Sequence, residues 1–150
     1  MVVAALSRAD RQHAAATRWL LAVDDDLVTS PLALAEMDYW ARKLGGPDLC
    51  LALWADFESG AYAVRWWADA LSETIAIARD HPHIGLTDAS LVALAGRLRT
   101  TRIATFDLPH FRALSTPDGE PFIVLPADSP LTPREETEPC PRTASTPSTP

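Results

Sequence analysis

Two short stretches decide the fold of this chain: GLTDASLVALA at residues 85–95 and IATFD at residues 103–107. In the first, Asp88 shares a helical face with three apolar residues, Leu91, Val92 and Ala95. This spacing predicts a helix over 88–99 with Thr87 as its cap. The second is a short apolar strand, predicted over 102–106, that ends at an acid. A helix followed at once by a buried strand is typical of α/β layering.

The rest of the chain repeats this alternation, so we predict an α/β domain. Ser30-Pro31 is a strong helix start, because the hydroxyl caps the helix and proline fits its first position. Gly45-Gly46-Pro47 stops that helix. The other predicted strands are 27–29, 62–66 and 122–125, and the other predicted helices are 9–22, 31–43, 47–57 and 67–80.

The composition separates a folded body from a tail. Seven of the chain's 13 prolines lie from Pro126 to Pro150, where almost nothing is apolar enough to build a core. We therefore expect one domain over 1–126 and a disordered tail, rich in Pro, Thr and Ser, over 127–150.

The charge balance excludes one class of protein. With 13 basic and 20 acidic residues the formal net charge is −7, which lacks the basic field of proteins that coat nucleic acid. No apolar run reaches the roughly 20 residues of a spanning helix, and the sequence does not open with a basic stretch followed by an apolar one, so we expect neither a spanning helix nor a secretory signal. Cys50 and Cys140 have no zinc-binding spacing, so we expect free thiols, Cys50 in the core, and a cytoplasmic protein.

Three acids lie where the pattern predicts apolar surroundings: Glu36, Asp88 and Asp107. Glu36 shares a helical stripe with Leu32, Ala33, Tyr39 and Trp40. Asp107 follows a strand, at the edge where open α/β sheets place their sites. Taken one at a time, each acid has a simple structural explanation. Glu36 would form a salt bridge, Asp88 would interact with the helix dipole, and Asp107 would cap a helix. Together, three converging carboxylates repel one another unless a divalent cation lies between them, and oxygen ligands favour Mg²⁺ or Mn²⁺.

A cation held in this way activates water and stabilises charge on a phosphoryl oxygen, so we infer phosphodiester hydrolysis. The same acids would also serve a phosphatase acting on small substrates. His81 and His83 lack a third ligand, and we interpret them as solvated. Four nearby bases either contact the phosphates of a single strand or are solvated cations at a helix end: Arg97, Arg99, Arg102 and Arg112.

These segments resemble a known family. GLTDASLVALA and IATFDLPHF, the latter at 103–111, resemble the C-terminal half of a PIN domain, and more narrowly the VapC-type toxins of bacterial toxin–antitoxin modules. SPLALAEM at 30–37 is similar to the helix that carries their glutamate, and DGEPF at 118–122 to the lead into their last strand. The resemblance covers roughly 1–126 and implies a three-layer fold whose central, mainly parallel sheet is flanked by helices.

The resemblance also implies a function. It predicts a Mg²⁺- or Mn²⁺-dependent endoribonuclease that cleaves RNA, pairs with a cognate antitoxin protein and forms a homodimer. Glu36, Asp88 and Asp107 fall on the family's catalytic and metal-binding acids. Thr105 falls on the hydroxyl position that supports the site.

The chain departs from the family at its beginning. The family starts with a buried strand ending in a metal-binding aspartate, whereas Met1–Leu6 resembles the stretch after that strand. We expect an in-frame segment upstream of Met1 to supply the strand, and a chain extended in this way to be more stable and more active. The alternative is a catalytically impaired PIN scaffold that binds an antitoxin or another protein partner. The five tryptophans of the chain either line a groove that binds a partner or pack in the core and at a dimer interface.

Overall fold

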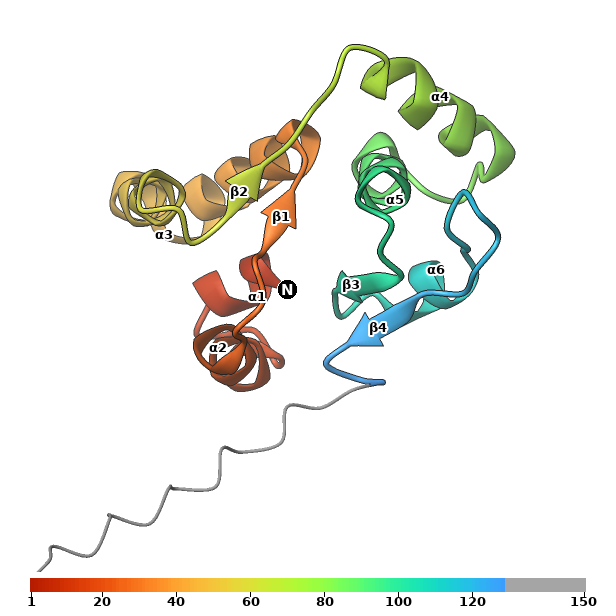
Figure 1. Ribbon diagram of the computed structural model, residues 1–150. Coiled ribbons are helices and arrows are strands. Elements are labelled where there is room, and N and C mark those ends of the chain that lie inside the picture. The colour runs from red at the N-terminus through yellow and green to blue at the C-terminus, as the bar shows by residue number, and fades with distance from the viewer. Residues whose placement is uncertain (129–150) are drawn as a thin grey trace, which may run out of the picture.

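The fold of residues 1–128 was described from a computed structural model. Helices and short strands alternate along the chain (Figure 1), which confirms the predicted α/β class. The elements are α1 Val2–Leu6, α2 His13–Ala22, β1 Val28–Thr29, α3 Pro31–Glu58, β2 Ala63–Val64, α4 Ala70–Asp80, α5 Leu86–Leu98, β3 Arg102–Ala104, α6 Leu108–Arg112 and β4 Ile123–Leu125. None of these helices combines the length and apolar character needed to cross a membrane.

Asp128, two residues after the predicted boundary at 126, bonds to the folded part of the chain. The Asp128 carboxylate accepts hydrogen bonds from the Val124 backbone N–H and from Arg112, each at 2.8 Å. Both bonds lower the pKa of Asp128, and the bond from the Val124 backbone has the larger effect. Apart from its first two residues, the tail predicted over 127–150 lies outside the described residues.

The strands form two separate parallel pairs. β1 pairs with β2, with Val28 opposite Ala63, and β3 pairs with β4, with Ile103 opposite Val124. Among residues 1–128 no ladder joins β1 to β3, so the expected central sheet is present as two halves. A cavity of about 440 Å³ lies between β1 and β3. Its lining includes Val28, Thr29, Glu36, Asp88, Ile103 and Ala104.

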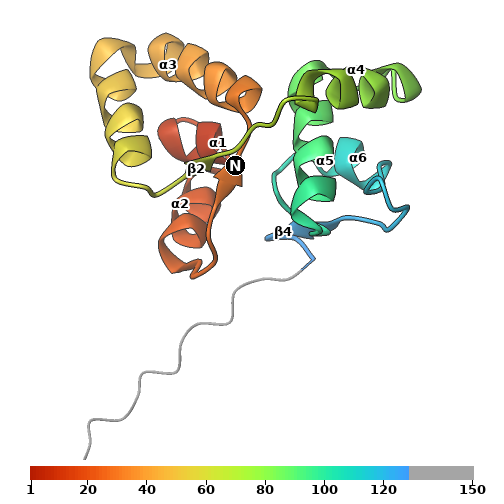
Figure 2. The same ribbon diagram turned by 45° about the horizontal axis from the view of Figure 1, so that its top comes forward.

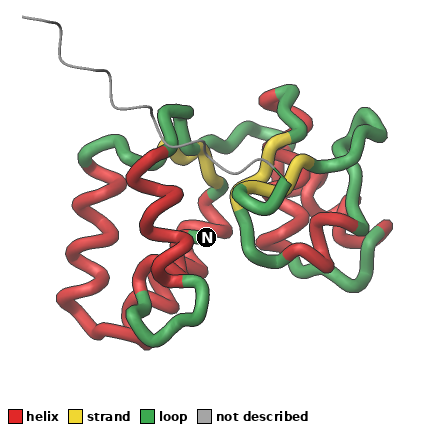
Figure 3. The backbone as a smooth tube through the Cα atoms, turned by 90° about the horizontal axis from the view of Figure 1, so that it is seen from below, coloured by secondary structure: helices red, strands yellow, loops and turns green. Residues whose placement is uncertain are grey.

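The helices gather around the two sheet halves. Figures 1 and 2 show α1, α2, β1, α3 and β2 on one side and α4, α5, β3, α6 and β4 on the other. Seen from below, the strands lie near the middle and the helices outside them (Figure 3). Each half has its own core: Ala41, Cys50 and Leu53 in the first, and Val92, Phe111 and Val124 among others in the second. Cys50 is fully buried, as predicted.

The long helix α3 begins and breaks where the sequence predicts. Ser30 caps it by accepting a hydrogen bond from the Ala33 N–H at 3.1 Å, and Pro31 follows at the first helical position. Gly46 has φ +66° and ψ −154°, which lies outside the helical region and suits glycine. The two arms, separated by this kink, enclose the first core together with α1. The two predicted helices are therefore present as one kinked helix.

A chain of buried hydrogen bonds joins the two halves. The Ser90 hydroxyl donates to the Thr87 carbonyl at 2.6 Å, so the Ser30 hydroxyl is the donor in its own 2.6 Å bond to Ser90 Oγ. Both serines are fully buried. The prediction that Thr87 caps this helix is wrong, because α5 begins at Leu86 and Gly85 occupies the cap position. The start of α3 is thus fixed against the N-terminal half of α5.

An ion pair joins the halves at the opposite edge of the sheets. Arg102, the first residue of β3, lies 2.9 Å from the Asp25 carboxylate just before β1. Both side chains are about half exposed, so the pair contributes little free energy compared with the buried serines.

We expect Ser30→Ala to lower the free energy of unfolding by about 1–3 kcal/mol, because it removes a helix cap and a buried hydrogen bond. Urea denaturation followed by circular dichroism measures this change. Ser59→Ala is the matched control, since Ser59 is exposed and bonds only within its own helix end. It should shift the unfolding free energy by less than about 0.5 kcal/mol. Equal losses in the two variants would contradict a structural role for the Ser30–Ser90 bond.

Candidate functional site

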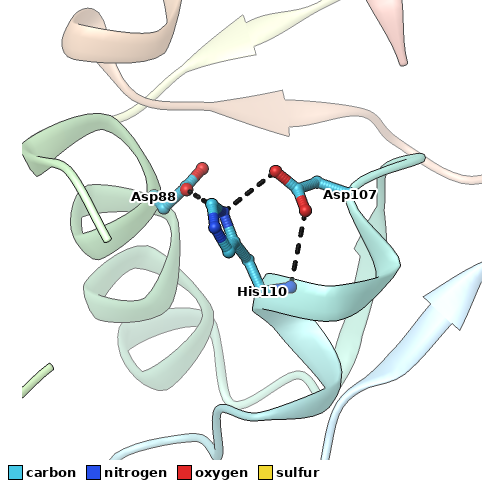
Figure 4. Close-up of side chains that lie close together, drawn as sticks. All are labelled: Asp88, Asp107 and His110. Carbon is cyan, nitrogen blue, oxygen red and sulfur yellow. Dashed lines mark hydrogen bonds and ion pairs between the residues drawn. The ribbon is translucent and has the colours of Figure 1, made fainter. Parts of the chain in front are cut away.

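Three side chains converge beside the carboxyl end of β3: Asp88, Asp107 and His110 (Figure 4). One ligand atom from each lies within 4.8 Å of the others. His110 Nδ1 lies 2.9 Å from Asp107 Oδ2 and 3.4 Å from Asp88 Oδ2. In the described part of the chain, this is the one group of three acids, histidines or cysteines whose ligand atoms converge in this way. The structure therefore brings together two of the three predicted acids.

Local hydrogen bonds position Asp107. Its backbone N–H donates to Thr105 Oγ1 at 3.0 Å, which fixes the turn as the chain leaves β3. One carboxylate oxygen, Oδ1, accepts the His110 N–H at 3.4 Å and caps α6. The other oxygen, Oδ2, points to the His110 ring. The capping role weighed for Asp107 is thus correct, and it leaves one oxygen available for the site.

Glu36 lies outside this group. It is exposed on α3, and so is its predicted core-facing neighbour Tyr39, at 56%. The expectation that this stripe faces the core holds for Ala33, which is buried, and is wrong for Glu36 and Tyr39. Glu36 lies instead at the cavity between the sheet halves. Glu36 and Asp88 both line that cavity, and the charge of Glu36 contributes to raising the pKa of Asp88. Glu36 is therefore near enough to act on Asp88 electrostatically.

The charges of the site oppose the ionisation of Asp88. Burial raises the pKa of Asp88 above its ordinary value of 3.8, and the negative charge of Asp107 raises it further. The charge of His110 lowers it, and Glu36 adds the smallest upward effect. The cluster is thus short of positive charge, which is the electrostatic condition that favours a bound cation.

His110 is the site residue that sequence reasoning missed. It lies three residues after Asp107, at the start of α6, and positions three apart share one face of a helix. The sequence DLPH at 107–110 indicated this residue, because an acid at the end of a strand is followed by a turn that begins with proline and places a histidine three residues later. His83 packs edge-on against the His110 ring, with 6.2 Å between ring centroids, and His81 packs against His83 at 5.9 Å.

Three of the four arginines considered for phosphate binding have other neighbours. Arg112 pairs with Asp128, Arg102 with Asp25, and the Arg97 guanidinium lies 5.1 Å from the centre of the Trp67 ring. Arg97 and Arg99 follow Asp88 by about ten residues on the same helix, a separation of roughly 15 Å. The expectation that these arginines lie near the acidic cluster is wrong for Arg97 and Arg99, which lie at the other end of α5. Arg102 lines the same cavity as Glu36 and Asp88, although its side chain pairs with Asp25.

We expect Asp88→Asn to raise the thermal midpoint at neutral pH in EDTA, because it removes a charge that the folded state disfavours. Because folding raises the pKa of Asp88, the native side chain keeps its proton at pH values between about 3.8 and the raised pKa, where the unfolded chain has lost it. The free energy of unfolding therefore falls as the pH rises through this range. The advantage of the variant should therefore vanish below that window. Thermal unfolding between pH 3 and pH 8 measures it.

Asp80→Asn is the control for the stability of Asp88→Asn. It changes the net charge equally at an exposed carboxylate that ends α4. A lower midpoint for Asp88→Asn at pH 7, or an advantage that persists unchanged at pH 3, would contradict the electrostatic account of the cluster.

Comparison with known proteins agrees with this fold. The family model described as PIN domain matches residues 1–115. Ribonuclease VapC26 of Mycobacterium tuberculosis is 34% identical over 128 residues, which cover 83% of this chain and 95% of that protein. The crystal structure of M. tuberculosis VapC20, a sarcin-ricin loop cleaving toxin, superposes with a TM-score of 0.66 at 20% identity, covering 71% of this chain and 85% of that one. The chain therefore belongs to the PIN-domain family, as a VapC-type member.

Proposed function

We propose that this protein is a metal-dependent endoribonuclease, the toxin of a type II toxin–antitoxin system, which hydrolyses RNA phosphodiester bonds. The observation that carries the proposal is its 34% identity to Ribonuclease VapC26 along 95% of that protein's length. The converging Asp88, Asp107 and His110 add a site of suitable chemistry. We further propose an antitoxin protein as partner, a homodimer, and the cytoplasm as location.

The residues of the cluster fit a divalent cation. Asp88 and Asp107 each offer a carboxylate oxygen within 4.8 Å of the other, and burial and mutual repulsion oppose the charge of Asp88. These two acids would hold Mg²⁺ or Mn²⁺, and Glu36 would complete the acidic set from the other side of the cavity. A bound divalent cation supplies charge stabilisation at a phosphoryl oxygen and a more acidic water.

The protein's own groups have separate tasks in this proposal. Asp88 and Asp107 provide negative charge on rigid elements, the first turn of α5 and the cap of α6. Thr105 holds the backbone of Asp107 and is a positioning residue. Glu36, exposed beside the cavity, is free to accept a proton from the attacking water.

Purified protein should cleave RNA with Mg²⁺ or Mn²⁺, and EDTA should abolish the cleavage. Asp107→Asn should lower the rate by roughly 10²-fold or more, because it removes charge where the cation is held. Cleavage of a fluorescently labelled RNA measures this rate. Asp118→Asn, in an exposed turn, is the matched control and should cleave like the parent. The site assignment is wrong if Asp107→Asn is equally active.

The supporting role of Thr105 predicts a contrast between two substitutions. Thr105→Val removes the hydroxyl that accepts the Asp107 N–H and should lower the cleavage rate roughly 10- to 100-fold, as loss of groups that orient metal ligands does. Thr105→Ser keeps the hydroxyl and should retain most of the activity. The two variants are compared in RNA cleavage at saturating Mn²⁺. If Val and Ser lower the rate equally, the hydroxyl has no such role.

A partner-binding scaffold without catalysis is the second candidate. It is favoured by exposed apolar side chains on and after α3, with Leu51 59%, Tyr39 56%, Trp54 42% and Trp66 39% exposed. Such residues are typical anchors of protein interfaces. Calorimetry separates the two candidates. Tight binding of the neighbouring gene's product without any binding of Mn²⁺ would support the scaffold and oppose the nuclease.

A further inference from the structure

We propose that His110 binds the divalent cation directly through Nδ1, as a third protein ligand beside Asp88 and Asp107, and that this mixed nitrogen–oxygen set makes the site prefer a transition ion such as Mn²⁺ over Mg²⁺. The inference rests on the proposed function in one respect only, namely that the cluster holds a cation. It adds a ligand that the predicted all-carboxylate set does not contain.

The distances suit three ligands of one ion. Neighbouring ligands of an octahedral ion, each at about 2.1 Å, lie about 3.0 Å from each other. His110 Nδ1 lies 2.9 Å from Asp107 Oδ2 and 3.4 Å from Asp88 Oδ2, on either side of that value. Figure 4 shows the ring between the two carboxylates, with the same nitrogen directed to both.

The condition of the nitrogen is an independent observation. Although 41% of the His110 side chain is exposed, its Nδ1 atom is buried between the Asp107 and Asp88 carboxylates, at 2.9 and 3.4 Å, and within residues 1–128 neither contact has the alignment of a regular hydrogen bond. Buried polar atoms without a hydrogen bond are rare and call for an explanation, such as an ion. A nitrogen that lies 2.9 Å from a carboxylate oxygen without the alignment of a hydrogen bond fits a shared ion.

The ring is also held in place before any ion binds. Its backbone is fixed in α6 by the N–H bond to the Asp107 cap, and the edge of the His83 ring packs against it. Ligands that are oriented in advance cost little entropy when an ion binds. His110 therefore has the geometry of a ligand and not that of a freely rotating surface histidine.

The chemistry of imidazole then gives the selectivity. Mg²⁺ prefers oxygen ligands and retains its waters, whereas first-row transition ions accept imidazole nitrogen readily. Two carboxylates alone would leave Mg²⁺ and Mn²⁺ closer in affinity. Adding one nitrogen strengthens the binding of Mn²⁺ more than that of Mg²⁺.

A different role for His110 leads to the opposite expectation. If the ring only neutralises Asp88 and Asp107 as a cation, it competes with any metal for the same carboxylates. Its removal would then strengthen Mn²⁺ and Mg²⁺ binding together. The two roles are therefore distinguished by the sign of the change.

Pulsed electron paramagnetic resonance of the full chain with one equivalent of Mn²⁺ tests the ligand directly. We expect a ¹⁴N coupling from a bound imidazole in the parent protein. The coupling should disappear in His110→Gln and persist in His81→Gln, a matched control whose ring packs on His83 and not on the cluster. A parent spectrum without nitrogen coupling, or no binding of Mn²⁺ at millimolar concentration, would overturn the proposal.

Calorimetric titration with Mn²⁺ and with Mg²⁺ tests the selectivity. His110→Gln should weaken Mn²⁺ binding roughly tenfold or more and Mg²⁺ binding distinctly less, so that the ratio of the two affinities falls. Equal weakening, or stronger binding of both ions, would overturn the selectivity. Both measurements are independent of RNA: nitrogen coupling in a protein that cleaves no RNA would refute the proposed nuclease and leave the ligand assignment standing.

Discussion

The buried hydrogen bond between Ser30 and Ser90 is the constraint on which the arrangement of the two halves depends. No ladder joins the two sheet halves among residues 1–128, so contacts between side chains must fix their relative position. The bond joins the cap of α3 to the second turn of α5, and these two helices carry Glu36 and Asp88. Because both hydroxyls are buried, water cannot replace the lost partner when the bond is broken. The spacing of the acids across the cavity is thus set by two serines that touch no substrate.

The acidic cluster is built at a cost to the fold. Partial burial and the charge of Asp107 disfavour the ionised form of Asp88, and His110 offsets only part of this effect. A protein selected for stability alone would place a neutral residue there. Retaining a carboxylate that the folded state disfavours is the familiar signature of a site arranged for charge chemistry, because a cation restores the balance.

Much of the fold could be predicted because it depends on local sequence. Ser30-Pro31 starts a helix, Gly46 breaks it, and the carboxyl end of an apolar strand places Asp107 at the edge of a sheet. The misses involve residues far apart in the chain. The split of the sheet, the pairing of Arg102 with Asp25 and the exposure of Glu36 depend on how two separate cores lie against each other, which helical and strand periodicity do not encode. His110 is the exception, since its spacing from Asp107 was local and readable.

The position of the cluster along the chain has a consequence for how it assembles. Asp88, Asp107 and His110 lie within a span of about 20 residues and belong to one core, so the entropy of closing the loop between them is small. Glu36 belongs to the other half and must wait for long-range docking. The cluster can therefore form early in folding and survive fluctuations that separate the halves, whereas the contribution of Glu36 rises and falls with their closure.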